Sequence, residues 1–292
     1  GSADPARVRE LLLKDGVAVL HCAGDAAGEA ADLPKRVLGD AWAAGLAPTE
    51  IRMKVDPDTQ LVQAVTFGQQ RKGGKHDQFG PTESNKSKTT NQVIDPLHVD
   101  GTKAFGYSAP DFILLFCAVP CPTGGANFVV DGEAVLQSMR EHPDHAWVAD
   151  AVFSRPVRQL YFSVTATGKG VWEGPLAIRH ESGRLQWQCP NVFDACEPRV
   201  VPLESSDDRE RDQAMIDIFA EHMRAAQASA ARFKLDAGDC LVVDNYRMSH
   251  GREPFTSLDR TLWRMWTWST RSSGGIPADV LADRTARRDC DI

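Results

Sequence analysis

The sequence predicts one α/β domain over residues 1–292, with a β-rich core in the form of a double-stranded β-helix, or jelly roll, packed by helices. Short apolar or alternating segments, typical of strands, recur between segments with helical periodicity. The residues best suited to a metal site also lie about 150 positions apart, and only a sheet or barrel joins such distant segments. No internal repeat or low-complexity boundary divides the chain.

Four segments are expected to be helices. A short helix covers residues 6–14, and an alanine-rich helix covers residues 25–38. A third begins at Asp131, a residue type that often caps helix N-termini, and continues to residue 141. The fourth, at 206–231, is long and well supplied with Ala, Met and Ile.

Strands are expected where a short run of apolar, β-branched or aromatic residues is bounded by turn-forming residues. Residues 239–244 contain a continuous apolar run, and residues 260–268 are rich in Thr and Trp and follow a reversal containing Pro, Ser and Asp. In chain order, the predicted strands are 17–21, 61–67, 112–119, 127–130, 160–164, 176–180, 184–188, 239–244 and 260–268.

Composition excludes several classes of protein. With 42% hydrophobic and 25% charged residues the chain is typical of a globular domain, and it contains no apolar run of the about 20 residues that a membrane span needs. The formal net charge of -7 argues against a nucleic-acid partner, which usually requires a basic face. Seven irregularly spaced cysteines indicate reduced thiols, and no signal sequence is recognised, so we expect a cytoplasmic protein.

Two segments are expected to lie outside the core. Residues 68–92 are polar and carry five basic residues against two acidic ones. Loops of this length in compact domains are often mobile lids, so we expect this one to help capture an anionic substrate or carrier; the alternative is a solvated surface loop. The tail from residue 272 is expected to be peripheral.

The tripeptide His98-Val99-Asp100 is the first candidate for metal binding. Residues two apart on a strand point to the same side, so His98 and Asp100 can offer a nitrogen and an oxygen to one point. A distant histidine, His250, would complete a set of two histidines and one carboxylate, which fills one side of an octahedral ion. Non-haem Fe(II) oxygenases use the open side for a cosubstrate and oxygen.

The predicted strand 260–268 carries two arginines on one face. Alternation places Arg260 and Arg264 on the same side with aromatic neighbours, about 13 Å apart at 3.3 Å per residue. A guanidinium inside an apolar barrel needs a carboxylate partner, so an acid ligand is expected there. Because of this distance, a small diacid should contact mainly one of the two.

In combination, these segments identify a resemblance. The chain resembles the TauD/TfdA-like (taurine dioxygenase) family, which includes the gamma-butyrobetaine hydroxylase and clavaminate synthase branches, over residues 95–268. The segments that carry the resemblance are His98-Val99-Asp100, Gly124-Gly125-Ala126-Asn127 with Asp131-Gly132, the stretch 245–252 around His250, and 260–264 with its two arginines. The resemblance implies a jelly-roll fold and dependence on Fe(II), 2-oxoglutarate and O2.

The resemblance also implies roles for individual residues. His98, Asp100 and His250 would bind iron. Arg260 would pair with the distal carboxylate of 2-oxoglutarate. Asn127 stands where many relatives have a threonine that touches the cosubstrate, and an amide can still donate a hydrogen bond.

The remaining assignments concern the substrate. Arg264 matches the second arginine of the family motif, and it and Lys103 are the candidate substrate-binding residues. The expected substrate is a small polar metabolite, anionic or amino-acid-like, either free or tethered to a carrier, and specialised metabolism is one setting for it. Halogenating relatives lack the carboxylate ligand, so Asp100 favours hydroxylation with release of succinate and CO2. Desaturation, epoxidation and cyclisation stay open.

Two other functions remain open from the sequence. A jelly-roll protein with this metal site could bind zinc and hydrolyse its substrate, or it could bind a small molecule without turnover. Neither function depends on 2-oxoglutarate. The arginine pair disfavours hydrolysis, because a binding site for a diacid has no evident use there.

Overall fold

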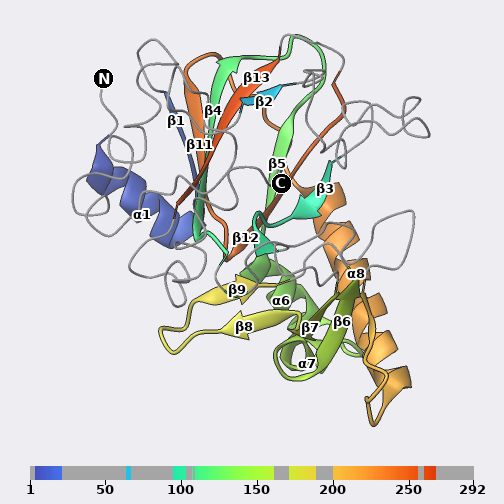
Figure 1. Ribbon diagram of the computed structural model, residues 1–292. Helices are drawn as coiled ribbons and strands as arrows, with labels where there is room; N and C mark the ends of the chain where they lie inside the picture. The colour runs from blue at the N-terminus through green and yellow to red at the C-terminus, as the bar shows by residue number, and fades with distance from the viewer. Residues whose placement is uncertain are drawn as a thin grey trace, which may run out of the picture.

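The structure of the protein is a computed structural model (Figure 1). The described residues are 4–21, 64–66, 95–102, 107, 109–160, 171–188, 200–255 and 260–267. Four predictions lie outside them: the helix at 25–38, the lid at 68–92, Lys103 and the tail from residue 272.

The larger sheet contains five strands among the described residues, and every neighbouring pair is antiparallel. In spatial order, they are β1 (Val17–His21), β11 (Asp239–Asp244), β4 (Phe112–Val119), β13 (Thr261–Thr267) and β2 (Ala64–Thr66). Helix α1 (Pro5–Asp15) contacts β1 and β11 at one side of this sheet (Figure 1). The apolar character of β4 and β11 explains why both occupy interior positions in the sheet.

The second sheet carries much of the candidate site. Its described strands, in spatial order, are β3 (Asp95–His98), β12 (Met248–Arg252) and β5 (Asn127–Asp131). Both pairings are antiparallel. Strand β12 was not predicted, because its sequence is polar and contains glycine; pairing on both sides with β3 and β5 overrides that low propensity.

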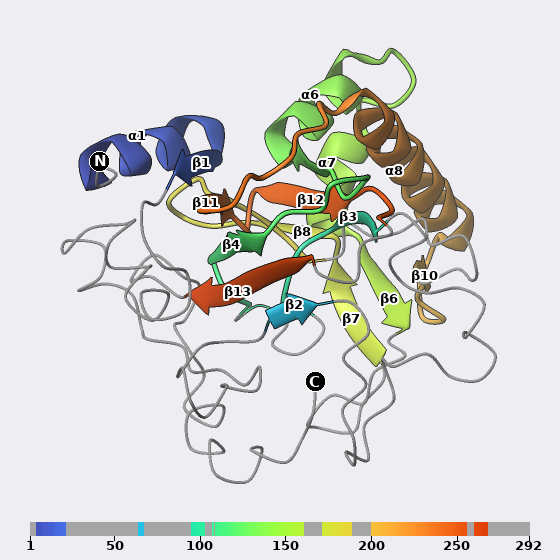
Figure 2. The same ribbon diagram turned by 90° about the horizontal axis from the view of Figure 1, so that it is seen from above.

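Helices and short strands form a layer behind the second sheet. The helices are α6 (Gly132–Glu141), α7 (Val148–Ser154) and α8 (Arg209–Ser229). Among the described residues, β10 (Val200–Pro202), β6 (Pro156–Leu160) and β7 (Val171–Pro175) form a three-stranded sheet, and β8 (Ala177–Arg179) pairs with β9 (Leu185–Trp187). Seen from above, α6 and α8, then β12 and β3, and then β4 and β13 lie in successive layers (Figure 2).

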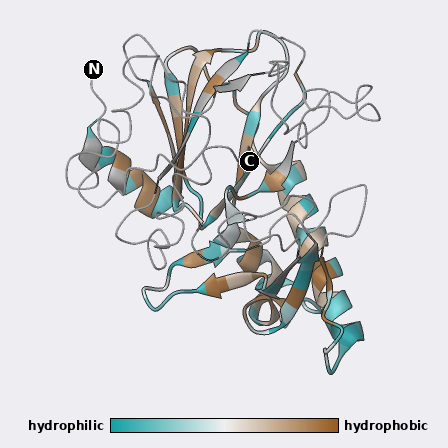
Figure 3. Cartoon of the chain, viewed as in Figure 1, coloured by the Kyte–Doolittle hydropathy of each residue, from teal (hydrophilic) through white to brown (hydrophobic). Residues whose placement is uncertain are grey.

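Two apolar clusters separate these layers. The inter-sheet core joins the two large sheets and includes Ile113, Leu115, Leu241, Val243, Met248 and Leu262. The helical core joins the second sheet to α6, α7 and α8 and includes Leu97, Phe128, Val130, Leu136, Trp187, Met215 and Phe219. Figure 3 shows brown, apolar stretches on β4 and β11, whereas α8 alternates between brown and teal along its length.

The structure confirms the predicted mixture of helices and strands. The predicted strands 17–21 and 112–119 match β1 and β4, and the helix predicted from Asp131 is α6, with Asp131 as its cap accepting a hydrogen bond from the Glu133 amide. The strand predicted at 160–164 shares residue 160 with β6, and its other residues, 161–164, lie outside the described part of the chain. Strands β7 and β10 and helix α7 were not predicted. None of the helices in the described ranges is long and apolar enough to cross a membrane.

Candidate active site

The two histidines of the predicted metal site are direct partners across neighbouring strands. His98 on β3 pairs with His250 on β12, and their ring centroids lie 4.3 Å apart. The Asp100 Oδ1 atom lies 3.6 Å from His98 Nε2 and 4.0 Å from His250 Nε2. One donor atom from each residue lies within 4.8 Å of the others, so the structure brings the three predicted ligands together.

The Asp100 carboxylate is buried and charged. Burial alone would raise its pKa, but the guanidinium of Arg264 and the imidazoles of His98 and His250 together hold the pKa of Asp100 well below its usual range. An Arg264 terminal nitrogen lies 3.2 and 3.1 Å from the two carboxylate oxygens. Asp100 is therefore ionised at neutral pH, the state that binds a cation.

The donor chemistry and the exposure of these residues fit a metal ion with an open side. Two imidazole nitrogens and a carboxylate oxygen are the donor set of facial Fe(II) sites. The side chains of Asp100 and His250 are 6% and 9% exposed, whereas that of His98 is 24% exposed. His98 is therefore the most solvent-exposed of the three side chains.

A pocket lies between the larger sheet and the second sheet. Arg260, Asn127 and Lys234 supply its polar wall. The remaining lining residues are Cys117, Pro120, Cys121, Gly124, Gly125, Leu235 and Leu262. Asn127 is two residues from Val129, the cross-strand partner of His250, so Asn127 and His250 point to the same side of the second sheet.

The glycine turn before β5 shapes this pocket. Gly124 has a left-handed φ of 76°, and a Cβ atom there would lie 2.2 Å from the Pro254 carbonyl oxygen. The Gly125 amide donates a hydrogen bond to the same oxygen at 2.8 Å, and a Cβ on Gly125 would lie 3.3 Å from Arg260 Nε. Only glycine fits this turn without moving Pro254 or Arg260.

The two arginines on the last strand segment reach different places. Arg264 lies against Asp100, and Arg260, 3% exposed, lines the pocket together with Leu262. The aromatic ring of Phe255 lies 4.7 Å from the Arg260 guanidinium carbon. Lys103, the other candidate for substrate binding, lies outside the described residues.

Sequence reasoning missed two residues of this region. Lys234 lines the pocket next to Arg260, but it follows a helix in an ordinary polar segment, and no motif marks it. Asn245 forms hydrogen bonds to the backbone of Asp100. Its position in a turn directly after a buried strand was a signal, because asparagine often fixes turns through its side chain.

Comparison with known proteins identifies the family. A family model described as "Taurine catabolism dioxygenase TauD, TfdA family" matches residues 2–266. The chain belongs to this family. The match confirms the resemblance found in the sequence, and with the His98, Asp100 and His250 cluster it supports the predicted class of Fe(II)- and 2-oxoglutarate-dependent oxygenases.

Individual relatives are more distant. A uridine-5'-phosphate dioxygenase from Streptomyces sp is 26% identical over 209 residues, and the match spans 69% of this chain but 65% of that relative. PvcB from Pseudomonas aeruginosa is 17% identical with a TM-score of 0.54, covering 92% of this chain and 83% of PvcB.

Two solved structures hold ligands. The non-heme iron oxygenase OrfP, in complex with Fe and alpha-ketoglutaric acid, is 16% identical, with a TM-score of 0.55 over 91% of this chain and 79% of OrfP. An asparagine oxygenase in complex with Fe(II), 3-hydroxyasparagine and succinate is 17% identical, with a TM-score of 0.53 and the same coverage. At these identities, the likeness is one of fold.

Proposed function

We propose that this TauD/TfdA family protein is an Fe(II)- and 2-oxoglutarate-dependent oxygenase that hydroxylates a small anionic or amino-acid-like metabolite. The observation that carries the proposal is the convergence of His98, Asp100 and His250, together with a buried Arg260 in a pocket between the same two sheets. A metal cluster alone would fit several chemistries. A buried arginine between the same two sheets supplies the second requirement, a group that binds a dicarboxylate.

We also infer that the two large sheets are the walls of a double-stranded β-helix. The chain passes from β2 in one sheet to β3 in the other, then to β4 and β5, and later from β11 to β12 and β13 in the same alternation. In a double-stranded β-helix of this kind the proposed metal ligands lie inside, between the walls, and the fold likeness to PvcB and OrfP supports this inference.

Each residue of the site has a role in this proposal. His98, Asp100 and His250 hold Fe(II), which together with 2-oxoglutarate and O2 supplies an oxidant strong enough for an unactivated C–H bond. Arg260 binds the distal carboxylate of 2-oxoglutarate, and Asn127 donates a hydrogen bond to it from the facing strand. The apolar side chains of the inter-sheet core keep water away from this space.

In this proposal, Arg264 interacts first with Asp100 and then with the substrate. It neutralises Asp100 in the structure, and its side chain is partly exposed (24%), so it can also meet an incoming anion. The names of relatives support an anionic or amino-acid substrate: one is a uridine-5'-phosphate dioxygenase, and others are bound to hydroxyasparagine or to (3S)-hydroxy-L-Arg. Lys103 and a lid at 68–92 complete the proposal for substrate capture. The presence of Asp100 favours hydroxylation over halogenation.

A spectroscopic experiment tests the chemistry independently of the substrate. The protein is incubated anaerobically with Fe(II) and 2-oxoglutarate, and the weak visible charge-transfer band of the chelate is recorded; succinate is then measured after air is admitted. We expect both signals in the wild-type protein and neither in Asp100→Ala. Absence of the band and of succinate in the wild-type protein would contradict the oxygenase proposal and favour a metal-dependent hydrolase or a binding protein.

The substrate class requires a separate screen. Nucleoside monophosphates, free amino acids and other small carboxylates are supplied with Fe(II), 2-oxoglutarate and air, and products are examined by mass spectrometry for the gain of one oxygen atom. We expect a product that carries a phosphate or carboxylate group. Turnover of neutral compounds only would contradict the proposed substrate class while leaving the oxygenase chemistry intact.

A further inference from the structure

Asn245 connects the turn after β11 to the metal ligand Asp100. It is 1% exposed, and its side-chain amide takes part in hydrogen bonds on both sides of the Asp100 residue. The Asp100 amide donates to Asn245 Oδ1 at 2.8 Å, and Asn245 Nδ2 donates to the Asp100 carbonyl oxygen at 2.9 Å. The same Nδ2 donates to the Pro110 carbonyl oxygen at 2.7 Å. A single side-chain amide therefore holds both the backbone N–H and the backbone carbonyl group of Asp100.

Asp100 needs such support because it lies beyond the sheet that holds the histidines. Strand β3 ends at His98, and the chain turns at Gly101, which has a left-handed φ of 79°. His98 and His250 are fixed by the pairing of β3 with β12. Asp100, two residues beyond the end of β3, is not held by this pairing; it is held by the hydrogen bonds of Asn245.

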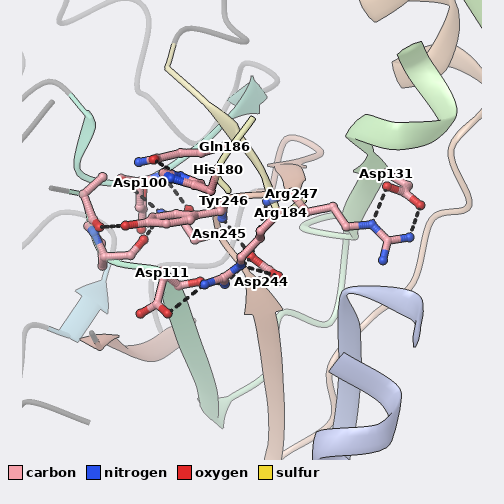
Figure 4. A network of polar contacts seen from close by, with 12 residues as sticks. Asp100, Asp111, Asp131, His180, Arg184, Gln186, Asp244, Asn245, Tyr246 and Arg247 are labelled. Atoms are coloured by element: carbon pink, nitrogen blue, oxygen red, sulfur yellow. Dashed lines mark hydrogen bonds and ion pairs between the residues drawn. The ribbon is translucent and has the colours of Figure 1, made fainter. Parts of the chain in front are cut away.

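Asn245 is itself held by a buried ion triad, which we define as Arg184, Asp111 and Asp244 (Figure 4). The Arg184 guanidinium lies 3.0 Å from Asp111 and 2.8 Å from Asp244, the residue that precedes Asn245. The Asn245 amide donates to the Asp111 carbonyl oxygen at 2.9 Å. Arg184 also lies over the ring of Tyr246, 4.6 Å from its centroid.

Two neighbours of the triad, Tyr246 and Gln186, hold the far end of the loop that begins at Asp100. Tyr246 donates from its hydroxyl to the Ala109 carbonyl oxygen at 3.2 Å, and Gln186 on β9 donates to the Tyr107 carbonyl oxygen at 2.9 Å. The turn 244–246 and the β8–β9 hairpin therefore hold both ends of this loop.

We propose that Asn245 is a positioning residue that sets the place of the Asp100 carboxylate relative to His98 and His250, and that the ion triad holds Asn245 in that position. This role rests on the proposed function, because it assumes that the three ligands bind a metal. Metal–ligand distances tolerate shifts of about 0.2 Å, so a small movement of the Asp100 backbone changes metal affinity. Asn245 contacts the backbone of Asp100, so its effect is on position.

Metal binding without turnover tests the proposal. Co(II) serves as the probe because its visible spectrum reports ligand geometry, and its affinity is measured anaerobically in the absence of 2-oxoglutarate. In Asn245→Ala, we expect Co(II) affinity to fall by about 10- to 100-fold, the usual loss when a group that orients a metal ligand is removed, and the spectrum to change. Asn245→Asp preserves the size of the side chain but loses both donated hydrogen bonds, so we expect a loss in the same direction.

The matched control is Arg155→Gln, which breaks the ion pair of Arg155 with buried Asp212 in the helical layer. It should lower stability without changing Co(II) affinity or the spectrum. If folded Asn245→Asp binds Co(II) within twofold of the wild-type protein with an unchanged spectrum, the positioning role is wrong although the metal site stands. If the wild-type protein does not bind Co(II) at all, the metal site and the positioning role are both wrong.

Discussion

At the scale of single residues, Arg260 and Arg264 lie in different surroundings. They lie four positions apart, yet Arg264 reaches Asp100 while Arg260 lies buried in the pocket. A guanidinium can bind a carboxylate through two parallel hydrogen bonds, so a diacid that enters this pocket is expected to meet Arg260. From the distance along the strand, the sequence predicted that a small diacid would contact mainly one of the two arginines; it did not predict the ion pair of Arg264 with Asp100.

Substitution of Arg260 tests the cosubstrate assignment. We expect Arg260→Ala to raise the KM for 2-oxoglutarate by well over tenfold, because loss of one partner of a buried charged pair costs about 2–5 kcal/mol. The measurement is succinate formation as 2-oxoglutarate is varied, with Arg264→Ala as the comparison. A larger cosubstrate defect in Arg264→Ala than in Arg260→Ala would reverse the two roles.

Lys234 gives a second and weaker prediction for the same pocket. Its Nζ donates to the Pro122 carbonyl oxygen at 3.1 Å, and the side chain is exposed, so water and salt screen its charge. We expect Lys234→Gln to raise the KM for 2-oxoglutarate by roughly threefold at low salt and less at high salt, with kcat unchanged. Lys14→Gln, on α1, is the control. A KM equal to that of the control at low salt would exclude Lys234 from cosubstrate binding.

The sequence predicted the metal ligands but not their support. His98, Asp100 and His250 stand out because their chemistry and their motifs are specific. Asn245 and Lys234 act through contacts with residues more than a hundred positions away, which no local pattern encodes. Residues with distinctive chemistry are therefore predictable, whereas residues that orient them require the tertiary structure.

At the scale of elements, the sequence predicted strands that contain a continuous apolar run. It did not predict the polar strand β12, which is a strand because of its neighbours in the sheet. Strands β1 and β4 were predicted with their bounds, because their apolar runs end at turn-forming residues. Strand β12 contains Ser249, His250, Gly251 and Arg252, and it is a strand because β3 and β5 pair with its two edges. The candidate metal ligand His250 on β12 is thus placed by the neighbouring strands rather than by local propensity.

The buried ion triad gives a prediction about the β8–β9 hairpin. Arg184→Met would leave Asp111, which is fully buried, and Asp244 without their cation, so we expect a loss of about 3–5 kcal/mol in the free energy of unfolding. The control is Arg179→Met on the same hairpin, whose ion pair with Glu133 is about one-third exposed and should contribute at most about 1 kcal/mol. Chemical denaturation measures both. Equal losses in the two variants would contradict a special role for the triad.

A histidine cluster between α8 and the α6–α7 loop gives a pH prediction. His222 Nε2 lies 3.0 Å from His145 Nδ1, and Ser138 Oγ lies 2.8 Å from His222 Nδ1. Burial and the neighbouring imidazoles of His145 and His142 lower the pKa of His222 from its ordinary 6.5, although Glu221 opposes the shift. The unfolded chain therefore takes up this proton at higher pH than the folded one, and stability falls as pH drops below about 6.5.

Thermal unfolding measured from pH 8 to pH 5 tests this effect. We expect the wild-type protein to lose more stability over this range than His222→Gln, which has no titrating group at the position. Because other groups titrate over the same range, the informative quantity is the difference between the two curves. Parallel curves would contradict a lowered pKa for His222.

At the scale of the whole molecule, the candidate site joins parts of the fold that are otherwise separate. His98 and His250 belong to the second sheet, Arg264 to the larger sheet, and Asp100 to the loop between them. The sequence predicted the class of enzyme and the three residues that the structure brings together as candidate metal ligands. It did not predict the three-layer arrangement, because the separation into an inter-sheet core and a helical core depends on long-range packing.

Because the site spans both sheets, metal binding should stabilise the entire domain. A ligand at 100 times its Kd that binds only the folded state adds about 2.7 kcal/mol to the free energy of unfolding. We expect Co(II) at that concentration to raise the Tm of the wild-type protein by roughly 5 °C or more, given about 2–4 °C per kcal/mol for domains of this size class. Differential scanning fluorimetry under anaerobic conditions provides the measurement.

Two variants decide where the stabilising metal binds. Asp100→Ala should lose the shift in Tm, since it removes a ligand and leaves two imidazoles, whereas His222→Gln should retain it. The opposite result would place the metal at the partly exposed histidines His142, His145 and His222, which lie within contact distance of one another. A further rise in Tm on addition of 2-oxoglutarate, lost in Arg260→Ala, would link the metal site to the adjoining pocket as one functional unit.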